Sequence, residues 1–185
     1  MLRLVRKIDG ILLNDDAVLA RRKMGFIPDR PYLYDKLTAR EFLHFLGSLY
    51  ELDASNLRNR IEAMLDQQGL LEMADALVEG FSHGMKQRLT LAGAMLHEPR
   101  LLIVDEPMVG LDPRGARQIK QTFRSLAQSG RTVFLSTHTL DVAAEVCDRL
   151  AIIHKGRIAR MGTLAEVVPV GKTLEDVFLE ITGGA

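Results

Sequence analysis

The strongest hydrophobic pattern in the chain is the run Leu101–Val104, which is followed directly by Asp105 and Glu106. Consecutive apolar residues of this kind predict a buried strand of a parallel sheet. Pro107 cannot donate a hydrogen bond to a sheet ladder, so we expect the strand to end just after the two acids. Similar patterns predict strands over residues 24–28, 132–136, 150–154 and 158–161.

Apolar residues at helical spacing predict the helices. Thr38 and Glu41 form a capping box, so a helix should run from there to about Tyr50. Ser82 is suited to cap a second helix that extends to about Leu96. Further helices are predicted from Asn14 or Asp15 to Arg22, over 55–68, 114–128, 140–146 and 174–181, and over a short stretch before Phe81.

The order strand, helix, strand, helix, strand over residues 101–154 predicts a parallel α/β layer. A turn at Lys155–Arg157 predicts a β-hairpin at the edge of that layer, and Asp9-Gly10 predicts a second turn between two short extended pieces. Residues 38–80 have a purely helical pattern. The predicted fold class is therefore α/β: a parallel sheet with flanking helices, plus a helical insert.

Composition excludes several classes of function. The 185 residues include 24 Lys and Arg and 24 Asp and Glu, so the formal charge is zero and predicts no general attraction to nucleic acid or anionic membrane. One cysteine, Cys147, excludes an internal disulfide and favours a reducing compartment. No segment is apolar and long enough for a signal peptide or a membrane span. We expect a cytoplasmic protein that reaches a membrane only through a partner.

The two acids suit a site for magnesium and a nucleotide, because open α/β sheets bind ligands at the carboxyl ends of their strands. Asp105 would hold the metal through water, and Glu106 would polarise an attacking water. His138 follows the next strand, at the same predicted edge. An ordinary strand with solvated acids explains Asp105 and Glu106 equally well when that segment is taken alone. A lone histidine at a strand end is more often a satisfied surface or core residue than a catalytic group.

The segment Phe81–Arg88 has a serine cap, free helix-terminal amides and Gly84, which allows a ligand to approach the backbone closely. These features predict an anion site at the start of the helix. An ordinary capped helix with solvated Lys86 and Arg88 is the more common explanation of such a segment by itself.

Together these segments resemble the ATP-binding cassette (ABC) family, the ATPase subunits of ABC transporters. Phe81–Met85 is similar to the family's signature motif, and 101–106 to the Walker B strand with its catalytic glutamate. Gly110–Asp112 resembles the D-loop, and His138 the switch histidine. The resemblance implies a partial ABC-type P-loop NTPase core with a helical signature subdomain, which uses ATP and Mg²⁺.

The resemblance also implies a role for each candidate residue. Glu106 and His138 are the implied catalytic residues. The implied nucleotide-binding residues are Ser82, His83, Gly84, Met85 and Asp112, and the implied metal ligands are Asp105 and Asp29. Three of these depart from the family pattern, because Asp29 replaces a glutamine, His83 a glycine and Met85 a glutamine.

A phosphate-binding loop of the form Gly-x-x-x-x-Gly-Lys-Ser/Thr is expected in this family. Gly171–Thr173 is the only Gly-Lys-Thr of the sequence, and Glu166 stands where the first glycine is needed. We interpret the chain as an N-terminally truncated cassette that binds ATP poorly alone. The expected domains are an N-terminal remnant (1–30), a helical subdomain (31–97), the α/β core (98–168) and a C-terminal helix (169–185).

The first functional hypothesis is an ATP-hydrolysing subunit of an ABC transporter of export type, since Thr173–Phe178 resembles the end of drug-efflux cassettes. The implied partners are a second cassette, as a homodimer or heterodimer, and a membrane-spanning permease. The permease would hold this chain at the cytoplasmic face of the membrane. The alternative is a non-catalytic cassette that donates its signature motif to a complete one. An ATPase of translation or chromosome maintenance is less favoured, because tandem cassettes and long coiled coils are absent. A sheet without its early strands should also leave apolar surface uncovered and favour self-association.

Overall fold

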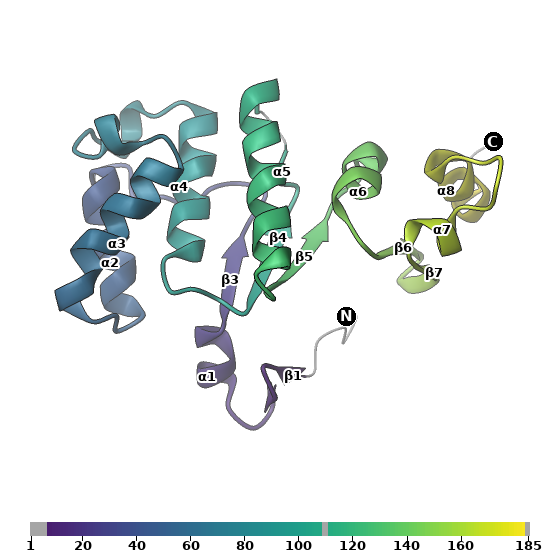
Figure 1. The fold of residues 1–185 in the computed structure, drawn as a ribbon, viewed down its shortest axis with the longest axis horizontal. Helices are drawn as coiled ribbons and strands as arrows, with labels where there is room; N and C mark the ends of the chain where they lie inside the picture. Colours follow the sequence, from purple (N-terminus) through teal and green to yellow (C-terminus); the bar gives the residue numbers. More distant parts are fainter. Residues whose placement is uncertain (1–6, 109–110, 184–185) are drawn as a thin grey trace. The chain divides into compact units, whose positions relative to one another are not determined.

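The computed structural model describes residues 7–108 and 111–183. The chain divides into two compact units, one of residues 6–136 and one that includes residues 137–185. Figure 1 shows the elements of both units along the chain. Each unit is described by itself below.

A three-stranded parallel sheet forms the centre of the first unit. Its strands are β3 (Met24–Ile27), β4 (Leu101–Asp105) and β5 (Thr132–Ser136), in the order β3-β4-β5. Figure 1 shows the three arrows side by side. Because all three are parallel, their carboxyl ends lie at one edge of the sheet.

One face of this sheet is covered by α4 (His83–Met95) and α5 (Pro113–Gln128), which contact β3 and β5 respectively. The approach of α4 depends on Gly25. A Cβ atom at this position would lie 2.5 Å from the carbonyl oxygen of Ala94 and 2.9 Å from Leu102 Cδ1. Glycine therefore allows the backbones of β3 and α4 to come close together.

The helical insert packs around its own core. It contains α2 (Ala39–Leu49), α3 (Ala54–Gln67) and two short 3₁₀ turns, Leu71–Met73 and Val78–Gly80. The core consists of fully or nearly fully buried apolar side chains from these helices and α4, among them Phe42, Leu43, Leu57, Ile61, Leu65, Val78, Leu89 and Leu96. At the N-terminal end of the unit, β1 (Lys7–Ile8) and β2 (Ile11–Leu12) form an antiparallel pair before α1 (Ala17–Arg22).

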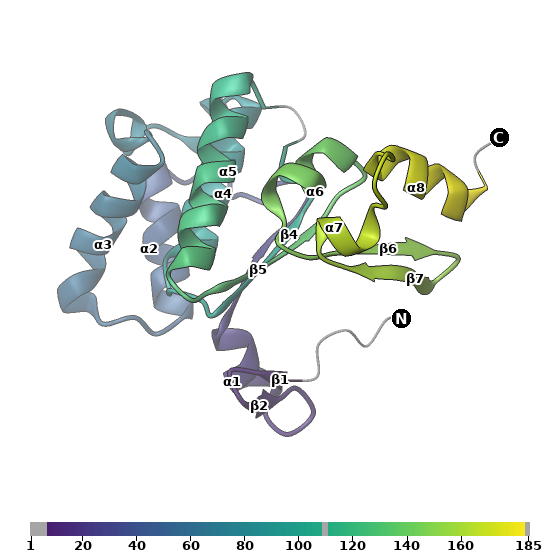
Figure 2. The same ribbon diagram turned by 45° about the vertical axis from the view of Figure 1, so that its right-hand side comes forward.

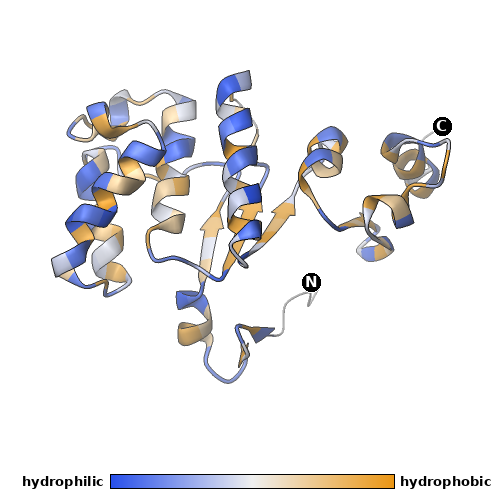
Figure 3. Ribbon diagram, viewed as in Figure 1, coloured by the Kyte–Doolittle hydropathy of each residue, from blue (hydrophilic) through white to orange (hydrophobic). Residues whose placement is uncertain are grey.

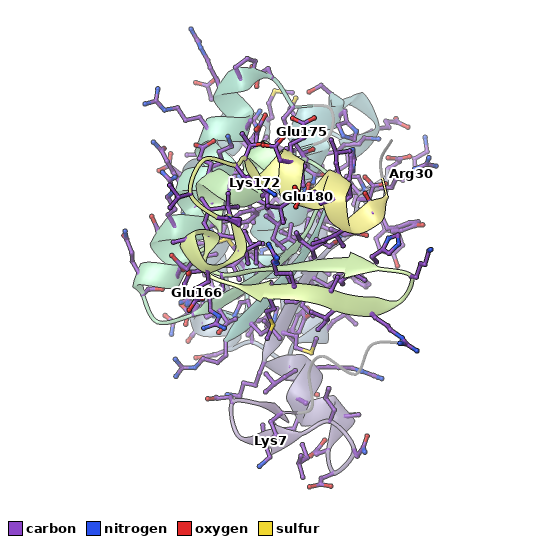
Figure 4. All side chains as sticks on the ribbon, turned by 90° about the vertical axis from the view of Figure 1, so that its right-hand side faces the viewer. Lys7, Arg30, Glu166, Lys172, Glu175 and Glu180 are labelled. Atoms are coloured by element: carbon purple, nitrogen blue, oxygen red, sulfur yellow. The ribbon has the colours of Figure 1, made fainter. Side chains whose placement is uncertain are left out.

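The second unit contains α6 (Leu140–Val146), the antiparallel strands β6 (Leu150–His154) and β7 (Arg157–Gly162), α7 (Leu164–Val167) and α8 (Leu174–Thr182). Figure 2 shows the hairpin beneath α7 and α8. Its core is small: Ile152, Val167, Leu174 and Val177 are buried. Lys172 and Glu180, both labelled in Figure 4, form an ion pair between the residues before α8 and the last turn of that helix.

The predicted α/β class is confirmed, as are the strand that ends at Asp105 and the capping box of Thr38 and Glu41. Two local predictions were imprecise. The side chain that caps α1 is Asp16, which accepts a hydrogen bond from the Leu19 amide, and two 3₁₀ turns replace the helix expected before Phe81.

The prediction that the parallel layer continues into residues 150–154 was wrong. β6 pairs with β7 in a separate two-stranded sheet, and the third parallel strand is β3. The reason is visible in the burial of β6, where Ile152 is the only buried residue. A strand of a parallel layer is normally covered on both faces, whereas an antiparallel pair can leave one face in water.

Candidate functional site

The ends of β4 and β5 hold Asp105 in place. The register pairs Asp105 with Ser136, and the Ser136 hydroxyl donates a hydrogen bond to Asp105 Oδ1. The amide of Glu106 donates to the carbonyl of Ser136 at 3.0 Å. Two contacts from one neighbouring residue thus fix the backbone and the side chain at the point where the acids leave the sheet.

Glu106 adopts a left-handed backbone conformation, with φ of +46°. This conformation costs an ordinary residue about 1–2 kcal/mol, and it turns the chain sharply out of the strand. A non-glycine residue is retained in such a conformation when the surrounding structure holds it there, and functional sites are enriched in such positions. Glu106 is therefore the residue at this edge with the most unusual local geometry.

Asp29 lies at the same edge of the sheet. Ile27 is paired with Val104, so the chain reaches Asp29 two residues after the end of this pair, as it reaches Glu106 on the neighbouring strand. The structure therefore brings Asp29, Asp105 and Glu106 to adjacent strand ends. All three are half-buried.

The start of α4 is capped as the sequence predicts. Ser82 Oγ accepts a hydrogen bond from the Met85 amide at 3.3 Å. His83 is the first residue of the helix, and Met85 packs against the helical core. A Cβ atom on Gly84 would lie 3.7 Å from Leu111 Cδ2, so the first turn of α4 lies against the residue that precedes Asp112.

Lys86 and Arg88 of this helix are half-buried, and both have protein partners. Lys86 Nζ lies 2.9 Å from Asp35 Oδ1. The Arg88 guanidinium donates to the carbonyl of Gln68 at 2.8 Å. These bonds tie the start of α4 to the loop before α2 and to the end of α3.

Asp112 is the N-cap of α5. Its Oδ1 accepts a hydrogen bond from the Gly115 amide at 2.8 Å, and Pro113 occupies the first helical position, where a missing amide hydrogen costs nothing. Of the predicted D-loop, Leu111 and Asp112 are described, whereas Gly110 lies outside the described residues. The carboxylate thus has a structural partner in the backbone of its own helix.

His138 lies in the second unit, just before α6. Its predicted place beside Glu106 stays a prediction. Sequence reasoning did not identify Ser136 as the residue that holds Asp105. The sequence did contain a signal for this contact: Asp105 and Ser136 are the last residues of two neighbouring parallel strands, and such strands end opposite each other.

Among the described residues, no group of three or more His, Cys, Asp or Glu side chains is placed to hold a metal ion. The carboxylates at this edge of the sheet are those of Asp29, Asp105 and Glu106.

The sequence model of the ABC transporter family matches residues 5–109, more than half of the chain. The chain belongs to the ABC transporter family. Its curated relatives include the linearmycin resistance ATP-binding protein LnrL of Bacillus subtilis, 36% identical over 160 residues, and the Nod factor export ATP-binding protein I of Neorhizobium galegae, 36% identical over 179 residues. The matches cover 86% and 95% of this ABC protein but 51% and 50% of the relatives, so the chain spans about half of their length.

Solved structures agree with this assignment. An ATP-binding subunit of an ABC transporter superposes with a TM-score of 0.86 at 32% identity, over 95% of this ABC protein and 75% of that chain. The cbiO1 protein of Clostridium perfringens, described as part of the ABC transporter complex cbiONQ, gives a TM-score of 0.74 at 25% identity, over 84% and 64% of the two chains. In the described part of the chain, no helix has the length and apolar character needed to cross a membrane.

Proposed function

We propose that this ABC protein is the ATP-binding and ATP-hydrolysing subunit of an ABC transporter, of export type. The observation that carries the proposal is the edge of the parallel sheet, where Ser136 fixes Asp105 and the left-handed turn at Glu106 places a second acid beside it. The export assignment is supported by the relatives named for Nod factor export.

Each acid at this edge has a distinct proposed role. Asp105, with Asp29, holds Mg²⁺ through oxygen ligands. Glu106 acts as the general base that accepts a proton from the attacking water, and His138 positions the terminal phosphate. Bound ATP supplies the phosphoanhydride bond that is hydrolysed. Ser136 has the proposed role of a positioning residue, because its hydroxyl donates a hydrogen bond to Asp105.

The start of α4 has the second proposed role, which is to contact a nucleotide held by a partner cassette. Helix N-termini favour anions because their amides are free and the helix dipole is positive there. Ser82, His83, Gly84 and Met85 would face the phosphates, with Asp112 beside them. The contact between Gly84 and Leu111 supports this grouping, since it links the start of α4 to the residue before Asp112.

The phosphate cradle is the part of the site that residues 1–185 do not contain in the family's usual form. We therefore propose that this chain alone binds ATP weakly. Charge-assisted hydrogen bonds of the kind that a phosphate loop supplies contribute about 1.5–3 kcal/mol each, so losing several weakens binding by orders of magnitude. The second candidate function is a non-catalytic cassette that donates the Ser82 helix to a complete one. The proposed domains of this ABC protein are residues 1–30, 31–97, 98–168 and 169–185.

An exposed aromatic surface on the helical insert supports a membrane partner. Tyr34 and Phe45 make an edge-to-face contact with ring centroids 5.3 Å apart, and Tyr32 and Leu49 are 85% and 61% exposed. Exposed apolar patches rimmed by polar residues mark protein interfaces, and aromatic residues are enriched in them. We propose that a membrane-spanning permease binds here and holds the chain at the cytoplasmic face of the membrane.

A titration with Mg-ATP tests the proposal. We expect residues 1–185 to bind ATP no more tightly than the millimolar range, and to sediment with a complete cassette only when Mg-ATP is present. In a complete cassette, the substitution equivalent to Glu106→Gln should abolish hydrolysis and retain binding, whereas Glu98→Gln should change neither. Tight binding by the chain alone would contradict the weak-binding proposal. Hydrolysis that survives Glu106→Gln would contradict the proposed base.

A further inference from the structure

The C-terminal end of α3 has two carbonyl groups that its own cap leaves over. The last four carbonyl groups of a helix have no partner within the helix. Gly69, with φ of +62°, ends α3 in a left-handed turn, in which the amides of residues 68–70 donate to the carbonyls of residues 64–66. Within the described part of the chain, no backbone amide reaches the carbonyls of Gln67 and Gln68.

Side chains from two other helices bind these carbonyl groups. The side-chain amide of Gln118, on α5, donates to the carbonyl oxygen of Gln67 at 2.9 Å. The guanidinium of Arg88, on α4, donates to that of Gln68 at 2.8 Å. Gly69 leaves room for this guanidinium, since a Cβ atom there would lie 3.2 Å from Arg88 Nη1. The end of α3 therefore holds both α4 and α5.

The two donors occupy equivalent positions on their helices. Arg88 is six residues after Ser82, the N-cap of α4, and Gln118 is six residues after Asp112, the N-cap of α5. An α-helix rises about 1.5 Å per residue, so each N-cap lies about 9 Å along its helix from the bond to α3. The end of α3 is thus a common reference point for the two N-caps.

A second contact joins α4 and α5 close to their N-caps. Leu111 Cδ2 lies 3.7 Å from the position of a Cβ atom on Gly84, and also 3.7 Å from that of a Cβ atom on Gly115. Leu111 therefore lies between the first turns of the two helices. Together, this contact and the bonds to the end of α3 restrict sliding of one helix along the other.

Gln118 lies at the border between the buried and the exposed faces of α5. Ile119, Phe123 and Leu126 are buried, whereas Gln118 is half-buried. Figure 3 shows hydrophilic colouring over most of the visible side of this helix. The Gln118 side chain can therefore reach the end of α3 from outside the apolar core, and its replacement opens no cavity in that core.

We propose that Gln118 is a positioning residue that sets the separation of the N-caps of α4 and α5. This role rests on the proposed function, in which Ser82 and Asp112 contact one nucleotide of a partner cassette. Two groups that bind one ligand must be held at a fixed separation, because small errors of placement weaken the contact. Gln118 acts through the end of α3 and touches neither N-cap.

Amide hydrogen exchange of residues 1–185 tests the positioning without nucleotide. Gln118→Leu removes the donor, whereas Gln118→Lys supplies another donor for the Gln67 carbonyl. We expect Gln118→Leu to speed exchange of the Gly115 amide by about threefold to tenfold, the factor that one ordinary hydrogen bond contributes, and Gln118→Lys to restore it. Gln121→Leu, at an exposed position of the same helix, is the matched control. Unchanged exchange in Gln118→Leu, or equally fast exchange in the control, would overturn the proposal.

Association with a complete cassette in Mg-ATP tests the consequence for function. We expect Gln118→Leu to raise the dissociation constant by about threefold to tenfold, and Gln118→Lys to restore it. Thr38→Ala removes the cap of α2 and controls for lost stability, so it should leave association unchanged. Equal association of Gln118→Leu and the unsubstituted chain would overturn the role of Gln118 and leave the proposed function standing. Failure of the unsubstituted chain to associate would contradict the proposed function, and the exchange of Gly115 would then decide whether Gln118 positions α5.

Discussion

The imidazole ring of His97 lies flat on the phenol ring of Tyr50, with ring centroids 3.7 Å apart and planes inclined by 6°. The Nε2 atom of His97 donates to the carbonyl oxygen of Met24 at 2.8 Å, while Nδ1 is buried and has no hydrogen-bond partner among the described residues. One side chain therefore connects the end of α4 to the ring that follows α2 and to the first residue of β3.

Stability should depend on the protonation of His97. Burial, with a further contribution from Arg60, lowers the pKa of this imidazole below its ordinary value of 6.5, although the bond to Met24 opposes the shift. The unfolded chain then binds the proton more tightly than the fold does. We expect the free energy of unfolding to be highest above pH 6.5, to fall as the pH drops from 6.5 toward the lowered pKa, and to level off below it.

Urea unfolding between pH 5 and 7.5 measures this dependence. His97→Gln should flatten the pH dependence in this window, because an amide can still donate to Met24 but does not titrate. His44→Gln, on the exposed surface of α2, should retain the slope of the unsubstituted protein. Identical slopes for all three proteins would show that His97 does not cause the dependence.

Ser82→Ala should separate stability from function. Loss of a serine or threonine N-cap costs about 1 kcal/mol. Thr38→Ala removes the comparable cap of α2, where Thr38 accepts a bond from the Glu41 amide at 3.1 Å. Both substitutions should lower the unfolding free energy by similar amounts, but only Ser82→Ala should weaken association with a complete cassette in Mg-ATP. Equal loss of association in both would point to a purely structural role for Ser82.

Sequence reasoning succeeded where a structure depends on neighbouring residues. The capping box of Thr38 and Glu41 involves two residues three positions apart, and the strand that ends at Asp105 is one apolar run closed by proline. In both cases the same few residues provide the pattern and the physical cause. The acids at the sheet edge were predictable for the same reason.

Contacts between distant residues were not predictable in this way. Lys86 pairs with Asp35, which lies 51 residues earlier, and nothing in the local pattern of either segment selects that partner. The separate sheet of β6 and β7 also escaped prediction, since the hydrophobic pattern of a strand does not state which strand it pairs with. Gln68 and Gln87 are 0% and 1% exposed, and their side-chain amides have no hydrogen-bond partner in the described chain. Because glutamine is a polar residue, the sequence gave no signal that the side chains of Gln68 and Gln87 would be buried.

Glu106→Gly should preserve stability while it removes the proposed base. Glycine tolerates the left-handed conformation of Glu106 without the cost of about 1–2 kcal/mol that a side chain incurs, although its more flexible unfolded chain offsets part of this gain. Glu98 also has a positive φ, +54°, and is the matched control; its side chain forms an exposed ion pair with Arg60. Both glycine variants should unfold within about 1 kcal/mol of the unsubstituted protein. In a complete cassette, only the change at Glu106 should abolish ATP hydrolysis.

The close approach of β3 and α4 makes Gly25 the least replaceable of the glycines that the sheet uses. The Cβ atom of Gly25→Ala would lie 2.5 Å from a backbone oxygen, which cannot move aside as the end of a flexible side chain could. Overpacking of this kind typically costs about 1–3 kcal/mol, and relief requires β3 to move away from α4. Gly80→Ala is the control, since a Cβ atom there would have no neighbour within 4 Å. We expect a lower midpoint of urea unfolding and faster amide exchange in Met24–Ile27 for Gly25→Ala, and no loss for Gly80→Ala.

Because β3 also leads to Asp29, Gly25→Ala should weaken the response of a complete cassette to Mg²⁺. An unchanged midpoint would mean that the strand and the helix are less tightly packed than the described contact requires.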